Sequence, residues 1–290
     1  MGSINFEKLD KLAKLSVSTG VALQKGQNLL ITAPSDALPL VRLIAKHAYK
    51  AGAGLVTPFF SDSEITLARY KFASDESFDV AADWLYKGMG EAFDNNTARM
   101  AIAGDDPMLL SDMDPERVAR ANKANSKAYK PARERITQFD INWNIIAWPG
   151  LAWAKRMFPD LAEGDAQTRL AEAIFMASRV NAEDPVASWK THNQRLKEKR
   201  EWLNQKDFKE IHFKGPGTDL KIGLADDHEW MGGASMAQNG VICNPNIPSE
   251  EVFTTPHALR VEGYVSSTKP LSHQGTLIDN IRVVFEKGSI

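Results

Sequence analysis

The first half of the chain alternates short apolar runs with amphipathic stretches. Residues 29–33 (LLITA) form an apolar run that predicts a buried strand. Pro34, Ser35 and Asp36 then supply a turn and a helix-capping group. The next stretch has helical spacing and ends at the glycines of residues 51–54, before a second predicted strand at 55–59. Since crossovers of this kind are right-handed, the two strands are expected to be parallel neighbours.

The same alternation continues to about residue 204. A helix is predicted over 84–93, a buried strand over 98–103 and a further strand over 142–148. Asp114-Pro115 and Asp184-Pro185 both combine an N-cap acceptor with a proline suited to the first helical turn, so each predicts a helix start. We therefore expect an α/β fold with an open, mostly parallel sheet of about four strands and helices on both faces.

The pattern changes after residue 205. Residues 211–213 and 220–224 flank a Gly-Pro-Gly turn and predict a β-hairpin, and further strands are predicted at 259–266 and 278–286. The predicted domains are residues 1–205, α/β, and residues 206–290, the first part of an antiparallel β-rich domain. Since the final residues, EKGSI, resemble a turn that leads to another strand, the C-terminal remainder of that domain is expected to be absent.

Composition narrows the functional classes. Hydrophobic residues make up 43% and charged residues 25%, and the formal net charge is -2. This balance is typical of a soluble globular protein and argues against nucleic acid or an anionic membrane as the main partner. The N-terminus lacks the apolar core of a signal peptide, and one cysteine, Cys243, cannot form an internal disulfide. The expected location is the cytoplasm.

Several motifs have a structural explanation that outweighs a chemical one. In KGPGTDL (214–220) a strand follows the glycines, so a hairpin turn is favoured over a phosphate loop. The six histidines lack metal-ligand spacing, and DDHEW (226–230) is interpreted as a solvated loop rather than a cation site. The topology also leaves open a hydrolase or transferase whose site lies where the first strands end, near residues 34–36 or Asp105-Asp106.

The segment CNPNIPSEEVFTTPH (243–257) places Glu250 and Glu251 side by side before a β-type run. Pro248 before the pair and Pro256 after it would hold a carboxylate in place, as a metal ligand or general base requires. Local chemistry alone favours a polar turn whose two acids face water.

Longer motifs resemble the thermophilic-type metallo-aminopeptidases, family M29. They are HFKGPGTDLKIGL, CNPNIPSEEVFTTPH, RVEGYV and GTLIDNIRVVFEKG, preceded in the same order by NLLITAP, WLYKGM, ANKANSKAYKPA and EDPVASWKTHN. The resemblance covers essentially the whole chain. It implies an exopeptidase that releases N-terminal amino acids from peptides with water activated by two divalent metal ions, zinc or cobalt, in a homodimer.

In the family motif, the second acid of the pair is the metal ligand. That position is Glu251 here, with Glu250 the less favoured choice. Strand alternation would send Glu250 to the opposite face, where it forms a salt bridge or is solvated.

The remaining family ligands, a glutamate, two histidines and an aspartate, have no counterpart motif in these 290 residues. Because a zinc site needs about three protein ligands, the chain as given is expected to hold few or no metal ions and to be inactive. The alternative is a non-catalytic α/β binding or dimerisation module on the same scaffold.

Overall fold

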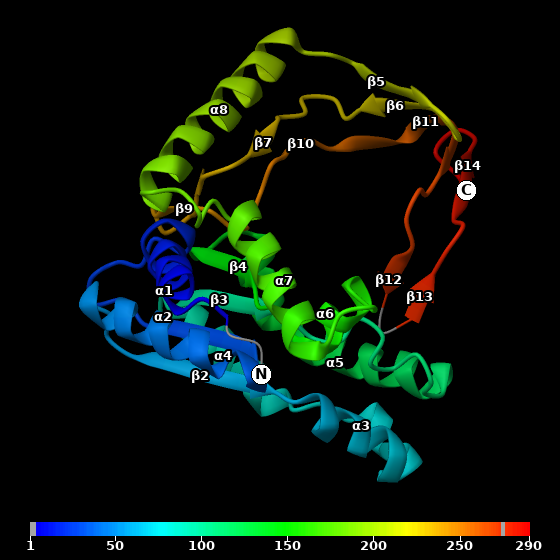
Figure 1. Ribbon diagram of the computed structural model, residues 1–290. Coiled ribbons are helices and arrows are strands. Elements are labelled where there is room, and N and C mark those ends of the chain that lie inside the picture. The colour runs from blue at the N-terminus through cyan, green and yellow to red at the C-terminus, as the bar shows by residue number, and fades with distance from the viewer. Residues whose placement is uncertain (1–3, 274–275) are drawn as a thin grey trace.

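A computed structural model describes residues 4–273 and 276–290. Its first layer is a parallel sheet with the strand order β2-β1-β3-β4, built from β1 (Leu29–Pro34), β2 (Val56–Ser61), β3 (Ala98–Ala103) and β4 (Trp143–Ala147) (Figure 1). The order reverses between β1 and β3. The parallel sheet predicted from the sequence is confirmed, and the predicted second strand begins one residue later than expected.

Helices cover both faces of this sheet, because alternate strand residues point to opposite sides. Leu29 and Ile31 lie in the core formed with α1 (Phe6–Leu15), α2 (Leu38–Lys50) and α7 (Glu163–Ala177). Leu30 lies in a second core with α4 (Asp83–Asp94) and α5 (Pro115–Thr137). The sheet is therefore buried on two sides, as the apolar strand sequences require.

The predicted helix starts are confirmed by their hydrogen bonds. Asp114 accepts a bond from the backbone N–H of Glu116 at 2.9 Å and opens α5. Asp184 accepts bonds from Val186 and Ala187 and opens α8 (Pro185–Lys206). The helices α3 (Ser63–Phe72) and α6 (Leu151–Met157) were not predicted.

The second half contains an antiparallel sheet with the order β14-β11-β6-β5. Its strands are β5 (Glu210–Gly215), β6 (Thr218–Leu224), β11 (Pro256–Ser266) and β14 (Arg282–Phe285). The β5–β6 connection is the predicted tight turn, and Gly217 takes the left-handed φ of +73° that this turn requires.

Three short strand pairs complete the second half. They are β7 (Met231–Gly232) with β10 (Val252–Phe253), β8 (Ser235–Met236) with β9 (Ile242–Cys243), and β12 (Leu271–His273) with β13 (Thr276–Ile278). The single strand expected over 278–286 is wrong, because Asn280 has a φ of +54° and separates β13 from β14. The β-type run expected at 252–255 forms a strand over its first two residues, β10.

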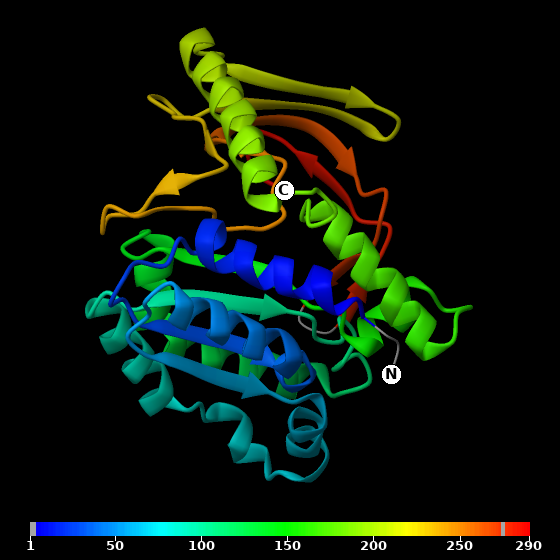
Figure 2. The ribbon, with the colours of Figure 1, turned by 60° about the vertical axis from the view of Figure 1, so that its left-hand side comes forward.

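The α8 helix connects the two layers. It starts beside the α/β layer and ends at β5, while β7, β9 and β10 lie between the parallel and antiparallel sheets (Figures 1 and 2). This arrangement brings the segment that contains Glu250 and Glu251 back onto the first half of the chain. In the described ranges, none of the helices combines the length and the hydropathy that crossing a bilayer requires.

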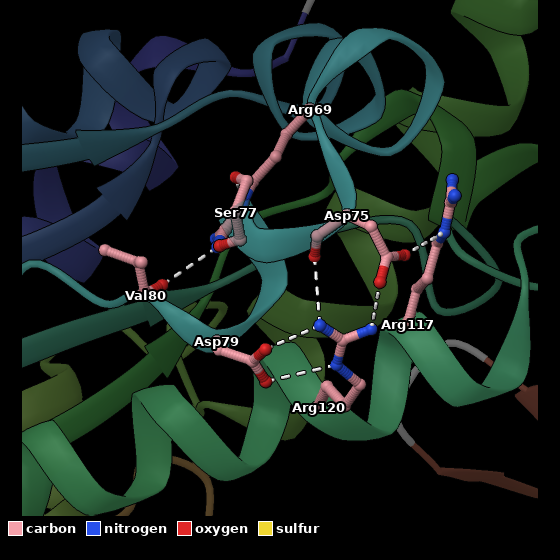
Figure 3. Close-up of polar contacts among 7 residues, drawn as sticks. All are labelled: Arg69, Asp75, Ser77, Asp79, Val80, Arg117 and Arg120. Carbon is pink, nitrogen blue, oxygen red and sulfur yellow. Dashed lines mark hydrogen bonds and ion pairs between the residues drawn. The ribbon is translucent and has the colours of Figure 1, made fainter.

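A network of arginines and aspartates holds the short helix η3 (Asp75–Asp79) against α5. The Arg120 guanidinium bonds Asp75 Oδ2 at 2.6 Å and Asp79 Oδ2 at 2.5 Å, and Arg117 also bonds Asp75 (Figure 3). Between these charges Phe78 is fully buried. The network thus fixes the connection between α3 and α4 to the long α5 helix.

Candidate metal-ligand segment

The segment before Glu250 is held by the edge of the parallel sheet. The backbone N–H of Ile145, in β4, donates to the Pro245 carbonyl at 2.7 Å, and the N–H of Ile247 donates to the Ile145 carbonyl at 3.0 Å. Ile145 and Asn246 form a parallel bridge, and Ile247 is buried. The segment therefore extends the sheet of the first half, although it belongs to the second half of the sequence.

Buried amide groups fix the same segment from the side. Asn244 exchanges two amide hydrogen bonds with Asn193 of α8, at 2.9 and 2.8 Å. Its carbonyl accepts from Asn144 of β4 at 2.7 Å, and its N–H donates to the Gly20 carbonyl at 2.8 Å. A Cβ atom at position 20 would stand 2.7 Å from Asn144 Oδ1, so this approach requires glycine. Four separate parts of the chain meet at Asn244.

Glu250 has a cationic partner. Its Oε1 accepts a hydrogen bond from Arg179 Nη2 at 2.6 Å, and the same nitrogen lies 3.0 Å from His192 Nδ1. His192 Nε2 lies 2.7 Å from the Ser249 carbonyl oxygen. Because guanidinium donates and carbonyl accepts, His192 accepts at Nδ1 and donates at Nε2, which fixes its tautomer. The salt bridge expected as one role of Glu250 is present.

Glu251 lies in a different environment from its neighbour. Its exposed side chain makes no hydrogen bond or ion pair with any residue that the structure describes, and it lines a cavity of ≈ 310 Å³. The other walls are largely apolar and include Ile136, Phe139, Trp143, Met231 and Phe253.

The backbone of Gly232 lies close to the backbone of Glu251. It has a φ of +141°, and a Cβ atom there would stand 2.5 Å from the Glu251 carbonyl oxygen. Together with the β7–β10 pairing, this approach fixes the Glu251 backbone and leaves its carboxylate free at the edge of an apolar cavity.

The residues present do not complete a metal centre. Within residues 4–273 and 276–290, no group of three or more His, Cys, Asp or Glu side chains is placed to hold a metal ion. A zinc site generally uses about three protein ligands, so Glu251 by itself does not fit one. Among the described residues that line the cavity, Glu251 is the one His, Cys, Asp or Glu side chain.

The other candidate residues have structural roles. Asp226, in the DDHEW loop, pairs with Arg260 at 2.7 Å, and this bond holds the pKa of Asp226 below its usual value. Burial raises the pKa of the Cys243 thiol to about 11, so Cys243 is protonated and unreactive at neutral pH. His212 of the β5–β6 hairpin pairs with Asp219 at 2.7 Å.

The carboxyl ends of β1 and β3 bring two acids together. Desolvation and, second, the charge of Asp36 raise the pKa of Asp105, although its side chain as a whole is exposed. Ser35 Oγ donates to Asp62 Oδ2 at 2.7 Å, and this bond holds the pKa of Asp62 low. Asp36 and Asp105 therefore lie close enough to interact, and among the described residues no group of three metal-ligating side chains is found at this edge.

Sequence reasoning missed the groups that hold the ligand segment. The histidine spacing predicts no metal-ligand role for His192, and it does not indicate that His192 contacts Arg179 and Ser249. The EDPVASWKTHN motif contains His192 and Asn193, which both contact the 244–250 segment. No local pattern marks Arg179, whose partner Glu250 is 71 positions away.

Comparison with known proteins identifies the family. Residues 5–290 match the family model described as thermophilic metalloprotease (M29). Aminopeptidase T from Thermus thermophilus is 49% identical over 280 residues, which are 97% of this chain and 69% of that protein. Aminopeptidase 2 from Geobacillus stearothermophilus is 40% identical, over 98% of this chain and 69% of its own length.

A solved structure agrees with these sequence matches. Wild-type AmpT from Thermus thermophilus has a TM-score of 0.91 and 48% identity, and the match covers 97% of this chain and 69% of that one. Both the predicted fold class and the family resemblance are thereby confirmed. The chain belongs to the M29 family of thermophilic metalloproteases, and its family activity is that of a metal-dependent aminopeptidase.

Proposed function

We propose that Glu251 is one ligand of a two-metal aminopeptidase centre, and that Glu250 is not a ligand. The observation that supports this proposal is the contrast between the two carboxylates. Glu250 is bound by Arg179, whereas Glu251 has no partner among the described residues and lines a cavity. A carboxylate that already accepts a 2.6 Å bond from a guanidinium is a poor metal ligand, and a free one on a fixed backbone is a good one.

The apolar cavity beside Glu251 is consistent with a peptide as the substrate. Phe139, Trp143, Met231 and Phe253 offer contact to an apolar side chain at the N-terminus of a peptide. When bound, two divalent ions, zinc or cobalt, would supply Lewis-acid activation of water and of the scissile carbonyl.

The 290-residue chain is expected to be inactive by itself, since its described residues contain no group of three side chains placed to hold a metal ion. The curated relatives are longer, and we infer that their additional residues hold the other ligands. A homodimer and a cytoplasmic location remain predictions from the sequence.

Activity and metal binding test this proposal together. With zinc or cobalt added, the purified chain should not hydrolyse leucine p-nitroanilide above the metal-only blank, whereas Thermus thermophilus aminopeptidase T assayed in parallel should. Equilibrium dialysis should detect no tightly held ion. Chelator-sensitive turnover by the chain would contradict the proposal. The binding module would be favoured by a metal-free, stable dimer that stays inactive even when the uncovered part of aminopeptidase T is joined to the chain.

The role of Glu251 needs an active background. In a chimera that adds the uncovered part of aminopeptidase T to this chain, Glu251→Gln should remove at least about 99% of the turnover, because metal-ligand loss disables the centre. The matched control Glu250→Gln keeps an acceptor for Arg179 and should retain most activity. Equal losses in the two variants would remove the distinction between the glutamates. Circular dichroism checks that both fold.

A further inference from the structure

A second cavity lies against the face of the parallel sheet that is opposite to α1 and α2. Its volume is ≈ 430 Å³, with a floor from β1 and β3 and walls from α4 and α5. It shares no lining residue with the cavity beside Glu251. An occupant of the one site would therefore not contact the residues of the other.

Arg99 is an unusual floor residue. It stands in β3 between two other strands, in register with Leu30 of β1 and Trp143 of β4. Such positions on a covered sheet face are normally apolar. The Arg99 side chain is partly buried, and it makes no hydrogen bond, ion pair or ring contact with any residue described in the structure. A partly buried guanidinium that lines a cavity and has no carboxylate beside it is available to pair with an anion there.

The walls add further donors and no acid. Arg133 contacts the Ser126 hydroxyl at 3.1 Å and has no carboxylate partner among the described residues. Tyr86 and Tyr129 lie with ring centroids 5.3 Å apart at 59°, and neither hydroxyl has a hydrogen-bond partner in the described ranges. Burial, and second the neighbouring Tyr129, raise the pKa of Tyr86, which keeps that hydroxyl a donor.

We propose that this cavity binds a small organic anion. Arg99 and Arg133 hold its carboxylate or phosphate group, and Tyr86 and Tyr129 contact its apolar or aromatic body. Guanidinium groups match the planar, bidentate geometry of these oxyanions, and tyrosines offer flat apolar area together with a donor. The site does not depend on the metal ligand proposed above.

Calorimetric titration of the 290-residue chain with defined probes tests the site. Phenyl phosphate and benzoate represent the two oxyanions, inorganic phosphate lacks the apolar body, and benzyl alcohol lacks the charge. At least one of the aromatic anions should bind, and tighter than both inorganic phosphate and benzyl alcohol by about tenfold or more. The stronger of the two identifies the preferred oxyanion. If neither binds at millimolar concentration, the proposal is wrong.

Substitutions locate the binding. Arg99→Met should weaken the affinity for the preferred probe by about tenfold or more, and Arg99→Lys should weaken it less. Arg42→Met is the matched control, because Arg42 is exposed on α2 against the opposite face of the sheet. It should leave the affinity unchanged. Unaltered binding by a folded Arg99→Met variant, or equal losses in the Arg42 and Arg99 variants, would overturn the site.

Discussion

At the residue scale, one arginine separates the roles of two adjacent glutamates. Arg179 holds Glu250 and also contacts His192, and His192 in turn holds the carbonyl of Ser249. The backbone that enters Glu251 is thereby fixed through its two preceding residues. A metal ligand needs this support, because a carboxylate on a mobile loop loses affinity to conformational entropy.

His192→Ala should release this support. The change leaves the Arg179 donor and the Ser249 carbonyl without their partner in a site where His192 is buried, so we expect the free energy of unfolding to fall by about 1–3 kcal/mol. Amide hydrogen exchange of residues 247–253 should become faster. The control is His212→Ala, on the exposed hairpin, which should change neither quantity appreciably. Unchanged exchange at 247–253 would show that His192 does not position Glu251.

At the element scale, the η3–α5 network is a local anchor. The Arg120 guanidinium accounts for the largest lowering of the pKa of both Asp75 and Asp79 (Figure 3). Since the folded pKa of each acid lies below its ordinary value of 3.8, each ion pair stabilises the fold fully above that value. The contribution is lost as the pH falls through the lowered folded pKa.

Amide hydrogen exchange of residues 74–80 should therefore become faster as the pH is lowered from about 5 to about 2, after correction for the intrinsic exchange rate. In the Arg120→Met variant, the amides of residues 74–80 should exchange fast at every pH in this range, and most of the extra pH dependence should be lost. Because the groups are exposed, added salt should have the same direction of effect as acid, though weaker. Slow exchange of this segment in the variant at neutral pH would show that Phe78 burial and the bonds of Arg69 and Arg117 hold η3 without Arg120.

The helices and strands differ in how well the sequence predicts them. Long, periodic segments such as those of α5 and α8 were predicted with their caps, because Asp114 and Asp184 act on neighbours two or three residues away. The short strands β7, β8 and β9 were not predicted, since each has two residues, too few to show an alternating pattern, and β7 pairs with β10 about 20 positions away. Asn280 falls inside the one strand predicted over 278–286, and its left-handed backbone separates β13 from β14.

At the scale of the whole molecule, the two predicted domains share structure across their boundary. The division at residue 205 remains a prediction, but residues 245–247 pair with β4, and Asn244 joins α8, β4 and Gly20. For the metal site, the family resemblance indicated one residue, Glu251, and its role as a ligand stays a prediction. Local chemistry had favoured a polar turn, because neither Arg179 nor the Glu251 cavity can be inferred from the neighbouring sequence.

Asn244→Ala should weaken both halves together. The variant loses two amide bonds and leaves Asn193 without its partner, so we expect about 1–3 kcal/mol less unfolding free energy. Thermal unfolding followed by circular dichroism and by tryptophan fluorescence should give one transition that moves to a lower temperature. Gln194→Ala, an exposed neighbour on α8, is the control. Two transitions, one of them unmoved, would mean that the halves unfold independently.

The docking of residues 245–247 on β4 also covers part of an outer strand of the parallel sheet. An outer strand with free backbone groups is a template for strand addition by another chain. At Ile145 both backbone groups are already occupied by the second half of the same molecule. On the opposite rim β2 contains Pro58, whose missing N–H removes a donor. A variant that loosens the 245–247 segment would therefore expose one rim of the sheet, and its loss of solubility would precede its loss of fold.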